Sequence, residues 1–165
     1  MIYRYFAFMK AASLAQIKNE LKGKSSDELM ALCLRLGRFK KDNKELMTYL
    51  LFEAQDEQGF IDLLKEDIED MMDEINTSHL YYVKKGLQKI VRSLNRSLRY
   101  SGQKQTEVAV RLYFCEKIRE TGIAIERHTT IHNLFLREIR RIEKALTGLH
   151  EDLQVDYQAD IEKLR

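Results

Sequence analysis

The sequence predicts an all-α fold, a single-domain helical bundle with short helices in the N-terminal half and long helices in the C-terminal half. Three observations lead to this prediction. Apolar residues recur at steps of three and four, as on one face of a helix. No segment shows sustained strand alternation or an Asn-Gly or Asp-Gly turn. The chain lacks proline, so helix ends depend on seven glycines and on polar caps.

The length and composition fit one helical domain spanning residues 1–165. An apolar share of 44% and a charged share of 33% are typical of a globular protein with a charge-rich surface. Residues 1–8 are apolar and aromatic but lack helical phase. Two explanations are open for these residues. Either they precede a native start at Met9, or they form an N-terminal strap whose aromatic side chains pack on the helical domain.

Polar caps divide the N-terminal half into three short helices. Ser13 can cap the first helix. Ser25 and Glu28 have the spacing of a capping box, in which each side chain binds a free amide of the first turn, and they open the second helix. Asp42 and Glu45 have the same spacing and open the third.

Longer helices follow. One begins after Gly59, a second spans about residues 80–100, and a third begins near residue 106. The last apolar pattern stays in phase from residue 131 to residue 164 across Gly148, so we expect one continuous C-terminal helix. We expect the main core to contain seven side chains from these helices: Leu87, Ile90, Leu94, Leu112, Phe135, Ile139 and Ile142.

Charge is distributed unevenly, although the formal net charge is only +2. An acidic segment, residues 62–74, carries seven acids and one lysine; the acids are Asp62, Glu66, Asp67, Glu69, Asp70, Asp73 and Glu74. Residues 75–106 contain no acid and seven bases: Lys84, Lys85, Lys89, Arg92, Arg96, Arg99 and Lys104. One explanation is an antiparallel helix pair whose flanking charges neutralise each other.

Five of these bases step by four and three residues and form one line on helix 84–99, the basic stripe: Lys85, Lys89, Arg92, Arg96 and Arg99. At about 100° per residue, Lys85 lies roughly 200° from the apolar Leu87, so the stripe should face solvent. An exposed cationic stripe can bind an anionic partner. Tyr81, Tyr82 and Tyr100 flank it and could stack on nucleic-acid bases.

Motifs that hold phosphates or metals are absent from the sequence. It contains no Gly-x-Gly, Gly-Lys-Ser/Thr, Cys-x-x-Cys or His-Glu-x-x-His. We therefore expect no catalytic residue, no cofactor and no small-molecule site. No stretch approaches the roughly 18 apolar residues of a membrane span. Cys33 and Cys115 lie in apolar helical patterns, which indicates buried free thiols and a cytoplasmic location.

Histidines offer two further hypotheses. His128 and His132 lie one helical turn apart, but no third ligand with metal spacing follows, so we expect no metal site. Arg127 and His132 match an Arg-x4-His spacing, which resembles the catalytic motif of metal-independent helical ribonucleases of the HEPN class. The resemblance covers two residues and implies attack on RNA through its 2′-hydroxyl.

The sequence thus favours a non-enzymatic helical module for protein–protein interaction or scaffolding, which either self-associates or binds an unknown protein partner. Binding of nucleic acid through the basic helix 84–99 is the alternative, and a ribonuclease is a distant third. In the first two hypotheses the basic stripe is the partner-binding site.

Overall fold

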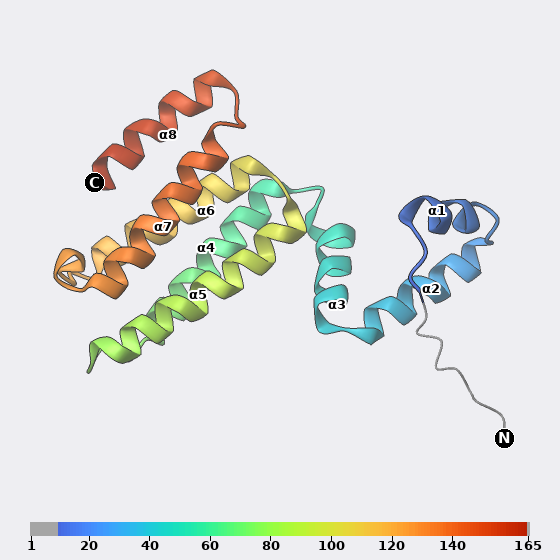
Figure 1. Ribbon diagram of the computed structural model, residues 1–165, viewed down its shortest axis with the longest axis horizontal. Helices are drawn as coiled ribbons and strands as arrows, with labels where there is room; N and C mark the ends of the chain where they lie inside the picture. Colours follow the sequence, from blue (N-terminus) through green and yellow to red (C-terminus); the bar gives the residue numbers. More distant parts are fainter. Residues whose placement is uncertain (1–9, 165) are drawn as a thin grey trace. The chain divides into compact units, whose positions relative to one another are not determined.

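The computed structural model describes residues 10–164, so the hypotheses about residues 1–8 lie outside the described part of the chain. Within that part the chain forms eight α-helices and no strand, which confirms the predicted all-α fold (Figure 1). Short helices come first and longer ones follow, as predicted. The chain divides into two compact units, residues 1–47 and 48–165.

The N-terminal unit contains α1 (Leu14–Lys22), α2 (Ser26–Phe39) and most of α3 (Lys41–Thr48). Ser13 and Ser25 cap α1 and α2, and both helices begin with a complete capping box, as their spacing predicted for α2. Each box satisfies two amides that a helix otherwise leaves free in its first turn. The polar residues therefore set where these helices begin.

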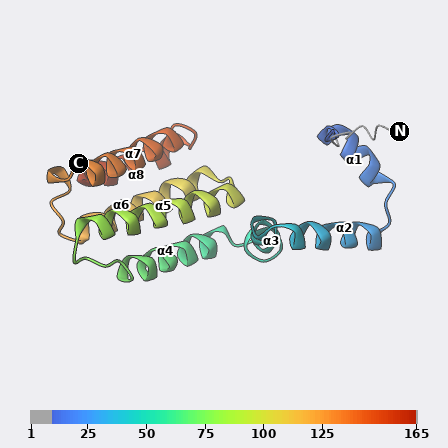
Figure 2. The same ribbon diagram turned by 60° about the horizontal axis from the view of Figure 1, so that its bottom comes forward.

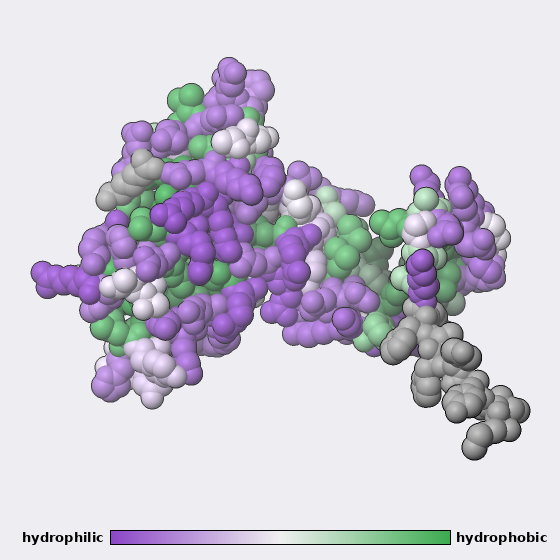
Figure 3. Space-filling model, viewed as in Figure 1, coloured by the Kyte–Doolittle hydropathy of each residue, from purple (hydrophilic) through white to green (hydrophobic). Residues whose placement is uncertain are grey.

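No described side chain between residues 10 and 47 is buried. The prediction that Cys33 is buried is wrong, because it is exposed. None of the residues of α2 is buried, so this helix packs no face in a core and the Cys33 thiol stays accessible. Hydrophobic residues accordingly show between hydrophilic ones on the surface of this unit (Figure 3). The large hydrophobic side chains that are exposed in the described part of this unit are Leu14, Ile17, Leu21, Met30, Leu32, Leu34, Leu36, Phe39 and Leu46.

The C-terminal unit is a bundle in which α6 contacts α4, α5, α7 and α8 (Figure 2). A five-residue π-helix, Tyr49–Glu53, leads into it, and a short 3₁₀ turn, Ile125–Arg127, joins α6 to α7. The helices of the bundle are α4 (Glu57–Asp73), α5 (Leu80–Ser101), α6 (Lys104–Glu120), α7 (Thr129–Leu146) and α8 (Glu151–Leu164).

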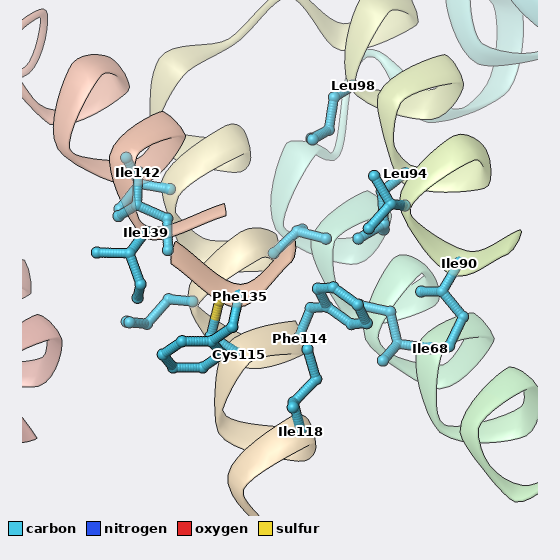
Figure 4. Close-up of a cluster of buried hydrophobic side chains, with 14 of the residues drawn as sticks. Ile68, Ile90, Leu94, Leu98, Phe114, Cys115, Ile118, Phe135, Ile139 and Ile142 are labelled. Carbon is cyan, nitrogen blue, oxygen red and sulfur yellow. The ribbon is translucent and has the colours of Figure 1, made fainter. Parts of the chain in front are cut away.

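The core forms where α4, α5, α6 and α7 meet (Figure 4). All seven predicted core side chains are buried, so the helical phases predicted for α5, α6 and α7 are confirmed. Leu80, which has the phase of the inner face of α5, is 43% exposed because it lies in the first turn of the helix, at its end. Cys115 is a buried free thiol, as predicted.

The expected continuous C-terminal helix is wrong, because α7 ends at Leu146 and α8 begins at Glu151. Gly148 lies in the break, and glycine costs a helix about 1 kcal/mol. A straight helix would carry the 18 residues after Leu146 away from the bundle by about 27 Å. The break instead returns α8 to α6, where Ile161 is fully buried.

Replacing Leu94 by alanine should lower the free energy of unfolding by about 2–5 kcal/mol, because the substitution opens a cavity in a packed core. Val155→Ala is the control, since Val155 is exposed on α8, and it should change the free energy by less than about 0.5 kcal/mol. Urea unfolding followed by circular dichroism measures both. Equal losses for the two variants would contradict the placement of Leu94 in the core.

Candidate anion-binding surface

The basic stripe faces solvent, as its phase predicted. Lys85, Lys89, Arg92 and Arg99 are exposed and Arg96 is half-buried. Since each residue lies opposite the buried side of α5, the helix directs the charges outwards while Leu87, Ile90 and Leu94 enter the core.

The stripe is not a neutralising seam against the acidic segment. Within the described residues, one ion pair joins them, between Lys89 Nζ and Glu74 at 3.3 Å. Both side chains are more than 60% exposed, at 62% and 69%, so solvent screens this pair. The acidic helix α4 pairs instead with α6, where Lys117 lies 3.2 Å from Glu69 and Tyr113 donates a hydrogen bond to the same carboxylate.

A pocket of about 390 Å³ opens between α5, α6 and α7, and Arg99 links it to the end of the basic stripe. Strongly hydrophilic residues gather over this part of the bundle (Figure 3). The sequence prediction contained no such site. The residues that line the pocket are Asn95, Leu98, Arg99, Lys104, Glu107, Arg111, Arg141, Lys144 and Ala145.

A buried ion pair forms the wall of the pocket. Arg111 of α6 donates to Glu138 of α7 at 2.6 Å, and their side chains are only 5% and 0% exposed. The other two nitrogens of this guanidinium donate to Glu107 at 3.1 Å and to Asn95 of α5 at 2.9 Å. Every nitrogen of Arg111 is thus engaged, which offsets the cost of burying its charge.

Arg141 joins the same network from the solvent side. Its Nη1 donates to Glu138 at 3.0 Å and to Asn95 at 3.2 Å, while its side chain remains 36% exposed. Glu138 therefore accepts from two arginines, one buried and one open to the pocket. This fixes Arg141 at one end and leaves the rest of its guanidinium at the surface.

The sequence contains a pattern that marks this network. Arg111 lies three residues after Val108 and four before Cys115, in phase with the apolar face of α6. Glu138 has the same relation to its buried neighbours on α7. A charged residue at a core position requires a partner, because an unpaired buried charge is strongly destabilising.

A polar cluster fixes the turn between α5 and α6, which carries Lys104 to the pocket. Glu57 of α4 accepts hydrogen bonds from Ser101, Thr106 and Tyr49, the last at 2.8 Å. Burial raises the pKa of Glu57, but these hydrogen bonds outweigh it and hold the pKa below its ordinary value. Burial and the hydrogen bond to Glu57 raise the pKa of the Tyr49 hydroxyl.

The structure does not bring the residues of the two histidine hypotheses together in one pocket. Arg127 and His128 line a pocket beside the N-terminal end of α5. His132 lines a different pocket, of about 250 Å³, with Arg119. Among residues 10–164 no three histidine, cysteine or acidic side chains come together as metal ligands would. Burial, and next the charge of Glu138, raise the pKa of the Cys115 thiol, so it is no nucleophile.

No family model, curated protein or solved structure matches this chain. In the described part of the chain, every helix is too short or too polar to cross a lipid bilayer. The basic stripe and the adjoining pocket are the two cationic features of the bundle surface described above.

Replacing Glu138 by alanine should lower the free energy of unfolding by about 3–5 kcal/mol, because it leaves Arg111 buried without its closest partner. Arg137→Ala removes an exposed charge 3.6 Å from the same carboxylate and should cost less than about 1 kcal/mol. A double variant, Arg111→Met with Glu138→Leu, should recover most of the loss. If chemical unfolding shows equal losses for Glu138→Ala and Arg137→Ala, and no recovery in the double variant, the network is not a structural unit.

Glu57 should make the bundle sensitive to acid. Because its folded pKa is lowered, its stabilisation is complete above the unfolded pKa of about 4.3 and is lost as the pH falls through the folded value. Unfolding free energies between pH 6 and pH 3 should therefore fall more steeply for the natural chain than for Glu57→Gln. Parallel curves for the two proteins would contradict this role.

Proposed function

We propose that this chain is a non-enzymatic interaction module whose basic stripe binds an acidic partner protein. The observation that supports the proposal most directly is the outward direction of the stripe, with four of its five side chains exposed. Lys85 to Arg99 span 14 helical steps, or about 21 Å, which is long enough to face a helix or an extended acidic segment. A cytoplasmic location belongs to the same proposal and is favoured by two free cysteines.

Aromatic residues beside the stripe favour a protein partner. Tyr81 and Tyr82 are exposed at the N-terminal end of α5, and their rings lie 5.5 Å apart. The ammonium of Lys85 lies 4.6 Å from the centre of the Tyr81 ring, so the aromatic and cationic groups form one surface. Tyrosine and arginine are among the residue types most enriched where protein interfaces gain their affinity.

Charge elsewhere on the bundle favours an acidic protein over a nucleic acid. The neighbouring α4 exposes Glu66, Asp70 and Asp73, which repel a long polyanion that extends beyond α5. The net charge of the chain is only +2, below that of dedicated nucleic-acid domains. Nucleic-acid binding through residues 84–99 stays the alternative, and the test below separates the two.

Charge reversal of the stripe, Lys89→Glu with Arg92→Glu, should abolish capture of a partner from native cell extract. Stability should change by less than about 1 kcal/mol, because both side chains are exposed. Lys18→Glu with Lys22→Glu is the matched control, since it reverses two exposed lysines of α1 and changes net charge equally. The partner should be acidic, and its affinity should fall as salt rises.

Two results would count against the proposal. If the reversed variant captures the same proteins as the natural chain, the stripe is only a solvated surface. If purified chain binds single- or double-stranded polynucleotide with stripe-dependent, salt-dependent affinity and captures no acidic protein, the nucleic-acid alternative is correct.

A further inference from the structure

The pocket between α5, α6 and α7 has an excess of positive charge. Five bases lie in it, namely Arg99, Lys104, Arg111, Arg141 and Lys144. Two carboxylates oppose them: Glu107 lines the pocket, and Glu138 lies buried behind Arg111. Five positive charges against two negative ones leave an excess of three. Like charges held this close repel one another, and an anion placed among them relieves that repulsion.

The bases differ in how much of their hydrogen-bonding capacity the bundle already uses. Arg111 donates from Nε, Nη1 and Nη2 to protein acceptors, so it supports the site without contacting a ligand. Arg141 uses Nη1 alone within the described residues. Lys104 makes one long pair, 3.5 Å from Glu107. Arg99 and Lys144 make no ion pair with any described residue. Four cationic side chains thus keep free donors at the mouth of the pocket.

From this arrangement we infer that the pocket binds a small molecule carrying a diphosphate group. Arginine presents paired N–H groups that match two phosphate oxygens, and lysine adds a point charge. A single phosphate carries roughly −1.5 to −2, which leaves part of the excess charge uncompensated, whereas a second phosphate compensates it. The buried Arg111–Glu138 pair holds Arg141 in place before the ligand arrives, so little ordering is needed on binding.

The size of the pocket favours a small ligand over a polymer. Its volume of about 390 Å³ lies in the range of small-molecule sites. Three helices surround it, and Leu98 and Ala145 add an apolar strip to a lining that is otherwise polar. An organic group attached to the diphosphate can cover this strip. The inference does not depend on the proposed protein partner, because only Arg99 is shared between the basic stripe and the pocket.

Isothermal titration calorimetry of the full chain with pyrophosphate and with adenosine diphosphate tests the inference. Both probes should bind at one site per chain, and adenosine diphosphate should bind more tightly because its nucleoside covers Leu98 and Ala145. Arg99→Gln with Lys144→Gln should weaken both probes by at least about tenfold, since each loses charge-assisted hydrogen bonds. Both positions are exposed, so the thermal unfolding midpoint should not change.

Lys85→Gln with Lys89→Gln is the matched control, because it removes the same charge from the basic stripe outside the pocket. It should change either affinity by less than about twofold. The inference is overturned if neither probe binds, if the control weakens binding as much as the pocket variant does, or if orthophosphate binds as tightly as pyrophosphate. A chain that binds a diphosphate but captures no acidic protein would refute the proposed function and leave the pocket assignment intact.

Discussion

The buried pair between Arg111 and Glu138 constrains much of the bundle. It places opposite charges on side chains that are only 5% and 0% exposed, so removing one partner leaves the other buried without its closest counter-charge. Because Asn95 completes the network, α5, α6 and α7 can slide past one another only by breaking it. Small shifts between the three helices are more costly here than in a purely apolar core, because they break these hydrogen bonds. The same requirement brings Arg141 to the surface beside it, so an element of the fold becomes the base of a cationic pocket.

The charged residues of the bundle therefore fall into two groups, one exposed on the surface and one buried and paired. At the surface, the basic stripe follows the helical repeat of α5, and four of its five side chains are exposed. Below it, charges are paired and held by packing. The pocket lies where the two meet, with Arg99 from the stripe and Arg111 from the interior in its lining. A surface that combines free cations with fixed ones can attract an anion over some distance and orient it on contact.

Features that belong to one helix could be predicted from the sequence, whereas features that need several helices could not. The burial of Leu94 and Phe135 and the exposure of Lys89 follow from the 3.6-residue repeat alone. The apolar repeat that continues across Gly148 wrongly predicted one helix. Such a repeat shows which face of a helix is apolar, but not whether the helix is interrupted and its axis changes direction. The pocket joins residues as far apart in the chain as Asn95 and Lys144, and no periodicity encodes that meeting. Even so, a charged residue in an apolar stripe was a readable sign of a buried pair.

The exposed apolar residues of the N-terminal helices have a consequence for how the chain opens. Since no described side chain between residues 10 and 47 is buried, opening α1 or α2 uncovers little apolar surface that water does not already reach. Backbone amides there can exchange their hydrogens through local fraying, while those of α6, with Val108 and Ile118 fully enclosed, exchange only when the bundle comes apart. The two units thus differ in the cooperativity of their opening. A partner that covers α1 and α2 would be detected first by slower amide hydrogen exchange in residues 14–39.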